Sequence, residues 1–277
     1  MRIISEGYRG ITNQIERIES GFMFLGHEIN KFIFDREGCD LFYANDINFW
    51  NSEKKRLAKK VILNLLDIPI HDVSATKKVI EIVNQNKHHT ITCISEYVKK
   101  QLKEYCGVEN SPIIYQPIKH VENMGWQRDI KYLIVGRNAD PMKGHRDVTF
   151  PAIHKIEGNF DNMHVVGESV GFGHYHGFVD DMDLMSLYAR AKYVFVPSRH
   201  DGFGLQLVES VVAGATPISY HWHPTAKEFL EKDLIFDKID DIVSFIKSEK
   251  THTPELYSDY AEKFSGEAVA KRILQLV

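Results

Sequence analysis

Short apolar runs alternate with amphipathic stretches through the first 120 residues. Residues 40–46 and 61–66 have the composition of short buried strands, and residues 74–87 carry apolar side chains at helical spacing. Ser95 and Gly107 bracket a further predicted helix as its N-terminal and C-terminal caps. Further predicted segments are strands at 2–5, 28–34, 90–94 and 112–115 and a helix from about 11 to 25. Strands that alternate with helices favour right-handed βαβ units, so we predict a parallel sheet here.

The same alternation resumes after a polar stretch at 116–129 that has no clear period. Strands are predicted at 130–135, 163–166, 193–197 and 216–220, and helices from 180 and at 240–247, 254–264 and 266–277. We therefore expect an α/β protein with a first domain over 1–120 and a second over 121–260. The last segment, 261–277, is expected to be a helix that can pack back toward the first domain.

Composition and charge exclude several classes of protein. The net charge of −4 gives no global basic field for nucleic acid. Three widely spaced cysteines form neither a disulfide framework nor a zinc motif, and no apolar run reaches the roughly 20 residues of a membrane span. The N-terminus leads directly into a predicted strand, unlike a signal peptide. We expect a soluble cytoplasmic protein.

The stretch from Val194 to Glu209 has the clearest chemical pattern. An apolar strand ends at Pro197, a loop follows with Gly202 and Gly204, and a helix begins near Leu205. Backbone N–H groups at a helix N-terminus attract anions. We therefore predict a phosphate site in this loop, with Asp201 and Glu209 as candidate ligands for sugar and ribose hydroxyls.

A second candidate phosphate site follows the strand at 130–135. Arg137 lies at the end of this strand, and Lys143 follows six residues later in a loop that precedes a predicted helix. A guanidinium fork and a mobile ammonium group can converge on one phosphate. The alternative is that both are exposed basic residues in a loop.

Candidates in the first half are less specific. Gly7 and Gly10 fit either a tight turn or a backbone-lined floor for a ligand. Asp67 follows a predicted strand, where open parallel sheets place ligands, although turn chemistry explains it almost as well. The basic run Lys54–Lys60 favours a solvated helix face; the alternative is a patch for an anionic acceptor or for peripheral contact with a membrane.

Fourteen histidines raise the question of a metal. His174 and His176, and likewise His221 and His223, are spaced as pairs on one strand face. Neither pair has a cysteine or carboxylate at a zinc-like spacing, and Pro224 favours a loop for the second pair. We expect no metal.

Several motifs together resemble the retaining nucleotide-sugar glycosyltransferases of family 4. The strongest are Val135-Gly136-Arg137 with Lys143-Gly144, Gly177-Phe178-Val179 with Leu184 and Tyr188–Ala191, Asp201-Gly202-Phe203-Gly204-Leu205 through Glu209, and Phe264–Leu276. Weaker matches cover Gly7–Gly10, Leu25–Glu28 and Ile94–Val98. The resemblance implies the GT-B fold, in which two Rossmann-like domains with parallel sheets face each other across a cleft.

The resemblance also implies roles for the motif residues. Arg137, Lys143 and the N–H groups from Gly202 to Leu205 would stabilise the leaving diphosphate, Glu209 would bind the ribose, and Asp201 would bind the donor sugar. Gly136, Gly177, Phe178 and Val179 would complete the donor site. Two departures from the family pattern concern Asp201, which replaces the usual glutamate, and Asp67, which stands where a histidine is usual; Asp67 or His71 can substitute for that histidine.

These points predict a glycosyltransferase that moves a sugar from a UDP- or GDP-sugar to an acceptor with retention and without a metal or other cofactor. The acceptor, whether glycan, lipid, protein or nucleic acid, is left open. One alternative is a catalytically weak sugar-nucleotide-binding or scaffold subunit. A second is an NAD-dependent enzyme, against which the absence of Gly-x-Gly-x-x-Gly counts.

Overall fold

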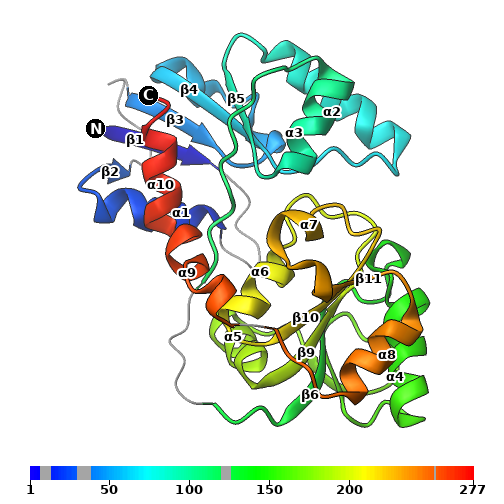
Figure 1. Ribbon diagram of the computed structural model, residues 1–277. Coiled ribbons are helices and arrows are strands. Elements are labelled where there is room, and N and C mark those ends of the chain that lie inside the picture. The colour runs from blue at the N-terminus through cyan, green and yellow to red at the C-terminus, as the bar shows by residue number, and fades with distance from the viewer. Residues whose placement is uncertain (7–13, 30–38, 120–125, 253) are drawn as a thin grey trace. The chain divides into compact units, whose positions relative to one another are not determined.

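The computed structural model describes residues 1–6, 14–29, 39–119, 126–252 and 254–277. The chain divides into two compact units. Unit 1 contains Met1–Ile118 and Glu262–Val277, and unit 2 contains Lys119–Ala261. Each unit is a parallel sheet with flanking helices (Figure 1).

Unit 1 has a five-stranded sheet in the order β2-β1-β3-β4-β5. Its strands are β1 (Arg2–Glu6), β2 (Glu28–Ile29), β3 (Cys39–Ala44), β4 (Ala58–Leu65) and β5 (Thr90–Cys93). Its helices are α1 (Gln14–Phe24), α2 (Val73–Gln85), α3 (Glu96–Cys106) and α10 (Gly266–Leu274). All of these strand pairs are parallel, as the alternation of strands and helices predicted.

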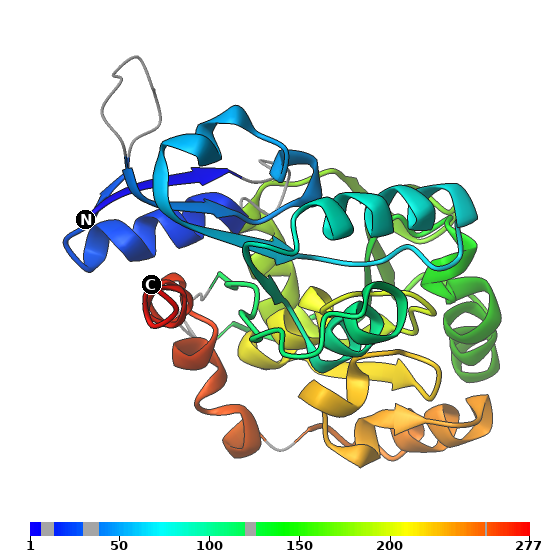
Figure 2. The same ribbon diagram turned by 90° about the horizontal axis from the view of Figure 1, so that it is seen from above.

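The C-terminal helix α10 belongs to unit 1 because it packs closely on α1. A Cβ at Gly21 would lie 2.1 Å from the carbonyl oxygen of Gly266, and a Cβ at Gly266 would lie 2.2 Å from that of Arg17. Val269 and Ile273 of α10 are fully buried in the same core as α1. Figure 2 shows α10 almost end-on beside α1.

Unit 2 has a six-stranded parallel sheet in the order β11-β10-β9-β6-β7-β8. Its strands are β6 (Ile130–Gly136), β7 (Met163–Gly167), β8 (His174–Gly177), β9 (Ala191–Val196), β10 (Thr216–Tyr220) and β11 (Ile235–Phe236). Its helices are α4 (Phe150–Glu157), α5 (Asp181–Arg190), α6 (Leu205–Val212), α7 (Ala226–Phe229) and α8 (Ile239–Lys247); α9 (Tyr260–Lys263) contains the boundary with unit 1.

The inner strands of the unit 2 sheet are buried on both faces, which explains the uninterrupted apolar runs of β6 and β9. Alternate residues of a strand face opposite sides. Thus Leu133 and Val135 of β6 join a core with α5 and α6, whereas Tyr132 and Ile134 join another with α4 and α8. In Figure 1, α4 and α8 lie together on one side of this sheet.

Three predicted elements are wrong. The basic run is not a helix: Glu53–Leu57 is a 3₁₀ turn capped by Ser52, and β4 begins at Ala58. Residues 112–115 form a single bridge, Cys93 with Ile113, because the Pro112 carbonyl accepts from Cys93 and Pro112 has no N–H to extend the ladder.

The third concerns residues 254–264, which form a 3₁₀ turn, Pro254–Tyr257, and the short helix α9. There Tyr257 Oη accepts from the Glu231 amide and Tyr260 Oη donates to the Phe229 carbonyl, which anchors two separate turns. No sequence pattern predicted α7 or β11. Of the strand predicted at 28–34, the described part is β2; the remainder, like Gly7 and Gly10, lies outside the described residues. No helix in the described ranges is long and apolar enough to cross a membrane.

Candidate functional site

The glycine loop between β9 and α6 is built around Gly204. This residue has φ of 81°, and a Cβ there would lie 2.9 Å from Thr225 Oγ1 and 3.4 Å from His223 Cε1. Thr225 Oγ1 also donates to the Phe203 carbonyl at 3.0 Å. Glycine is therefore needed both for its left-handed backbone and for the close approach of the turn at 221–225.

Asp201 lies inside this loop with its carboxylate turned onto the backbone. Its Oδ1 accepts from the amides of Phe203, at 3.2 Å, and Gly204, at 2.7 Å. Its Oδ2 lies 3.6 Å from Lys143 Nζ. Burial raises the pKa of Asp201, but Lys143, His223 and the two amide bonds outweigh burial, so the net pKa is lowered and the group is ionised at neutral pH.

Lys143 reaches Asp201 because two loops are fixed to each other. The 3₁₀ turn Pro141–Lys143 follows β6, and its Met142 carbonyl accepts from the Arg199 amide at 2.7 Å. Gly144, with φ of 72°, passes so close to β9 that a Cβ would lie 2.3 Å from the Pro197 carbonyl oxygen. The Lys143 side chain is only 15% exposed. The structure thus brings together a cation and an anion that lie 58 positions apart in the sequence.

Arg137 has a different environment from Lys143. Its side chain is 72% exposed, and its guanidinium lies 3.4 Å from Asp140. Asp140 also caps the 3₁₀ turn by accepting from the Met142 amide. Arg137 therefore lies on the same loop as Lys143, but it is paired within that loop instead of with Asp201.

Glu209 lies on α6 and is almost completely buried. Tyr188, on α5, is also buried, and its hydroxyl has no hydrogen-bond partner in the described part of the chain. Burial raises the pKa of Tyr188 well above its usual value, and the charges of Glu209 and Asp201 raise it further. Two carboxylates, a lysine and a neutral phenol thus share one low-dielectric region of unit 2.

His145 and His223 are site residues that the sequence analysis missed in this role. Burial lowers the pKa of His223 to about 4, with Asp201 opposing and Lys143 adding to the shift. Burial also lowers the pKa of His145 to about 3, and its Nδ1 lies 2.9 Å from Thr149 Oγ1. The sequence holds two weak signals: His145 follows Gly144, and His223 precedes Pro224. Neither signal is specific for a site residue.

Two amide side chains, of Gln206 and Asn138, donate hydrogen bonds to backbone carbonyls at the carboxyl ends of β6 and β7. Gln206 Nε2 donates to the Val135 carbonyl at 2.7 Å, close to Gly136, whose φ is 110°. Asn138 Nδ2 donates to the carbonyls of Val166 and Glu168 at 2.8 and 3.0 Å. The Gln206 bond joins the glycine-loop helix α6 to the end of β6, and the Asn138 bonds join the loop after β6 to the end of β7.

The remaining donor-site candidates follow β8. Gly177 ends this strand with φ of 74°, and Phe178 is 67% exposed. Val179 packs against the core shared with α5 and α6. The aromatic face of Phe178 is therefore open to a stacking partner, while Val179 anchors the loop.

Asp67 lies in unit 1, two residues beyond the end of β4. It is half-buried, and its charge helps to raise the pKa of Tyr97 to about 12, after burial as the larger cause. His71 is exposed in the following turn. Both candidates therefore belong to unit 1, while Arg137, Lys143, Asp201 and Glu209 belong to unit 2.

The histidine pairs behave differently from one another. His221 is exposed, 3.8 Å from Asp237, whereas His223 is buried, because the segment is a turn, as Pro224 suggested. On β8, His176 Nε2 lies 2.8 Å from His164 Nδ1 of β7. Within the described ranges, no group of three or more His, Cys, Asp or Glu side chains has an arrangement that could hold a metal.

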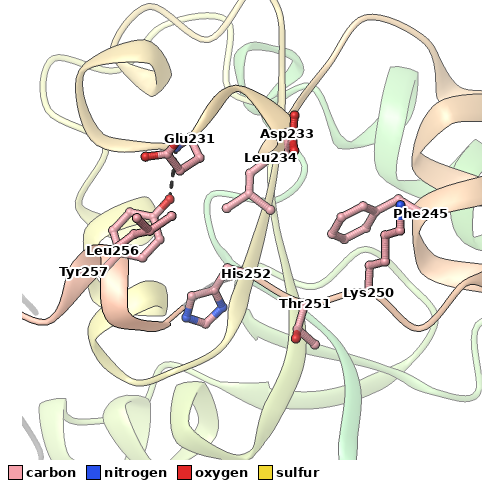
Figure 3. A pocket seen from close by; sticks show the side chains of 9 residues that line it. All are labelled: Glu231, Asp233, Leu234, Phe245, Lys250, Thr251, His252, Leu256 and Tyr257. Carbon is pink, nitrogen blue, oxygen red and sulfur yellow. Dashed lines mark hydrogen bonds between the residues drawn. The ribbon is translucent and has the colours of Figure 1, made fainter.

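A separate cavity of about 230 Å³ lies at the opposite end of the unit 2 sheet. Figure 3 shows the side chains that surround it, including Phe245, His252 and Tyr257. His252 Nδ1 lies 3.2 Å from Oγ1 of Thr216, the first residue of β10, so the cavity is at the amino ends of the strands. Parallel sheets bind ligands at their carboxyl ends, and the Lys143–Asp201 pair lies there.

Comparisons with known proteins agree with this arrangement. Residues 173–238 match the family model "Glycosyl transferases group 1". No curated protein matches the chain significantly. Among solved structures, Alr3699/HepE from Anabaena, in complex with UDP and glucose, superposes with a TM-score of 0.72 at 14% identity over 100% of this chain and 99% of that one.

Two further solved structures share the fold. The sucrose-phosphate synthase tll1590 of Thermosynechococcus elongatus gives a TM-score of 0.75 at 10% identity over 100% of this chain and 98% of that one. AviGT4, a glycosyltransferase involved in avilamycin A biosynthesis, gives 0.67 at 11% identity over 99% and 96%. The chain therefore has the GT-B fold, and the partial family match supports a glycosyltransferase.

Proposed function

We propose that this protein is a glycosyltransferase that uses a nucleoside-diphosphate sugar as donor, retains the anomeric configuration and needs no metal. The observation that carries the proposal is the placement of Lys143 beside the glycine loop, at the carboxyl end of a parallel sheet. A largely covered ammonium group, 15% exposed, beside a loop that leads into a helix is a favourable site for an anion. The family model covers this glycine loop, which supports the same reading.

The chemistry follows from the charges around the loop. When the bond between the sugar and the diphosphate breaks, negative charge grows on the leaving phosphate while the sugar becomes oxocarbenium-like. Lys143, the loop amides and Arg137 would stabilise that charge, in the way that preorganised donors lower a barrier by several kcal/mol. These groups can do the work of a divalent cation, so activity in EDTA is expected.

Glu209 would bind the ribose hydroxyls, as carboxylates do at other nucleotide sites. Phe178 would stack on the donor base. We take UDP as the first nucleotide to test, because solved structures with this fold contain UDP and UDP-glucose. Asp67 and His71 remain candidates for contacts with the sugar or acceptor.

The basic run is a weaker acceptor or membrane patch than its sequence suggests. Lys54 pairs with Glu6 at 2.6 Å, and Lys59 pairs with Asp40 at 2.8 Å. Lys55 Nζ donates to the Trp50 carbonyl and to Asn86 Oδ1. Much of this positive charge is therefore used within unit 1, and an acceptor of any charge is compatible with the proposal.

The test is a donor screen in EDTA. Purified protein should release UDP or GDP from one of a panel of nucleoside-diphosphate sugars, and adding Mg²⁺ or Mn²⁺ should change the rate less than about twofold. Proton NMR of the fresh product, followed from the first minutes, should show the donor's anomeric configuration. Inverted product would refute retention, and a strict metal requirement would refute metal independence.

A catalytically weak sugar-nucleotide-binding subunit is the second candidate. The observation that favours it is the use of Asp201 Oδ1 by the loop's own amides, which leaves that oxygen unable to bind a sugar. Calorimetric binding of UDP without release of UDP from any donor would support this function over transfer.

A further inference from the structure

Asp201 already places an anion where a phosphate is expected. Aspartate has the length that lets a carboxylate accept from amides two and three residues ahead, as in a helix cap or an Asx turn. Here those amides belong to Phe203 and Gly204. Glutamate, one methylene longer, is poorly suited to this geometry. An incoming diphosphate must therefore compete with Asp201 for the loop amides.

The buried ring N–H of His223 has no hydrogen-bond acceptor in the described part of the chain. The Thr225 amide donates to His223 Nδ1 at 3.3 Å, so this nitrogen has no proton and the neutral ring must carry its proton on Nε2. His223 is only 3% exposed. No group in the described part of the chain accepts from Nε2. An unsatisfied buried donor costs about 1–3 kcal/mol, which favours any rearrangement that supplies an acceptor.

The two groups belong to one cluster. His223 Cε1 lies 3.4 Å from the position of a Cβ on Gly204, and the Gly204 amide is bound by Asp201. Burial lowers the pKa of His223 to about 4, so the ring is neutral at pH 7 and Nε2–H is a donor that carries no net charge. A neutral N–H donor can bind the Asp201 carboxylate without placing a second positive charge beside Lys143.

We propose that Asp201 is an internal anion that a donor diphosphate displaces from the amides of Phe203 and Gly204, and that His223 Nε2–H then donates a hydrogen bond to the displaced carboxylate. This inference rests on the proposed function. His223 is thus a positioning residue: it acts on the donor site through Asp201. In this exchange Asp201 loses its hydrogen bonds from two backbone N–H groups and gains one from the imidazole. The two N–H groups and Lys143 then become available to the diphosphate.

Calorimetry with UDP tests the role of His223 through a matched pair of variants. Asparagine can keep an acceptor for the Thr225 amide but loses the distal donor, whereas glutamine places an N–H near the position of Nε2. We expect H223N to weaken UDP binding about tenfold and H223Q to stay within about threefold of wild type, the range of one hydrogen bond. H221N, at the exposed neighbour, should leave the affinity unchanged.

A double-mutant cycle tests the coupling to Asp201. D201N removes the internal negative charge, so it should tighten UDP binding several-fold. In the D201N background, H223N should change the affinity less than about twofold, because no carboxylate remains to be received. Equal losses from H223N and H223Q, or a full tenfold loss in the D201N background, would overturn the proposal.

A measurement on the unsubstituted protein guards against misfolded variants. In ¹⁵N-histidine NMR, the His223 ring should carry its proton on Nε2, and this resonance should shift when UDP is added. A protonated Nδ1, or an Nε2 signal that UDP does not move, would contradict the proposal. If the wild type binds neither UDP nor GDP when each is titrated by calorimetry, the proposed function falls as well. If it binds UDP and the variants behave alike, only the role of His223 falls.

Discussion

The carboxyl ends of the two sheets carry similar polar residues that are used in opposite ways. In unit 1, Asn45 Oδ1 accepts from Tyr43 Oη, Asn64 Nδ2 and Gln116 Nε2, and Thr92 Oγ1 donates to Asn64 Oδ1. In unit 2, by contrast, Lys143 meets Asp201 at 3.6 Å, longer than a hydrogen bond, and His223 keeps an unused N–H.

This difference distinguishes a polar core from a binding site. The network around Asn45 satisfies its members internally, so it stabilises unit 1 and has little capacity left for a ligand. The cluster around Lys143 holds a partly exposed charge pair, 15% and 19% exposed, at more than hydrogen-bond distance, which leaves hydrogen-bonding capacity for a ligand. In this protein, the strand-end residues of unit 2 are therefore the better candidates for a ligand site.

The largest expected effect breaks the unit 2 cluster. K143A should lower the rate of UDP or GDP release from a donor sugar by about 10²–10³-fold, because one preorganised donor to the developing negative charge is lost. The matched control is K155A, since Lys155 is an exposed lysine of the same unit that pairs with Asp240. Initial rates under saturating donor check this. Equal activity in both variants would mean that Lys143 does not face the diphosphate.

The next effect breaks the unit 1 network. N64A should lower the free energy of unfolding by about 3 kcal/mol, because Asn45 Oδ1 and Thr92 Oγ1 lose a buried partner. Urea denaturation measures this loss. UDP affinity at a temperature well below the transition should stay unchanged, which separates stability from binding. N84A, at an exposed position of α2, should cost less than about 0.5 kcal/mol.

A smaller effect concerns Glu209, where charge and hydrogen bonding can be separated. E209Q keeps the size of the side chain but loses the charge, and the KM for the donor should rise about 10–100-fold, the range for hydrogen bonds to a charged group. A fall in kcat with no change in the KM for the donor would argue against a role in nucleotide binding. E255Q, at an exposed glutamate of unit 2, serves as the control.

The smallest expected effect is a pH dependence of the stability of unit 2. Burial lowers the pKa of His252 to about 4 from an unfolded value near 6.5, and His145 and His223 are also lowered. The unfolded chain then binds more protons than the folded chain as pH falls below 6.5, so stability present above 6.5 is lost toward pH 4. Each histidine should cost about 1 kcal/mol between pH 6.5 and 5.5.

These three histidines belong to unit 2. Acid should therefore lower the unfolding temperature of unit 2 more than that of unit 1, and H252Q should remove about 1 kcal/mol of the loss. Scanning calorimetry at pH 6.5 and 5.5 measures both quantities. A parallel fall of both units, or a variant with the full pH dependence, would contradict the assignment.

Most of the longer strands and helices, in their correct order, could be predicted from local sequence patterns. Apolar runs flanked by turn residues identified β6, β9 and β10 because both faces of these inner strands are buried, and caps such as Ser95 and Gly107 act within one helix turn. Prediction from sequence failed where long-range contacts override the local pattern. The basic run, for example, forms a 3₁₀ turn and the start of β4. The sequence also identified the glycine loop, Lys143 and Glu209 as candidates.

How those candidate residues interact depends on long-range contacts in the folded chain. The sequence could not show that Asp201 turns onto the amides of Phe203 and Gly204, because the choice depends on the close passage of Gly144 past Pro197 and of Gly204 past Thr225. Nor could it show that His223 is buried while His221 is exposed. Periodicity and capping are local, whereas burial, charge pairing and protonation depend on neighbours that the chain brings together from distant positions.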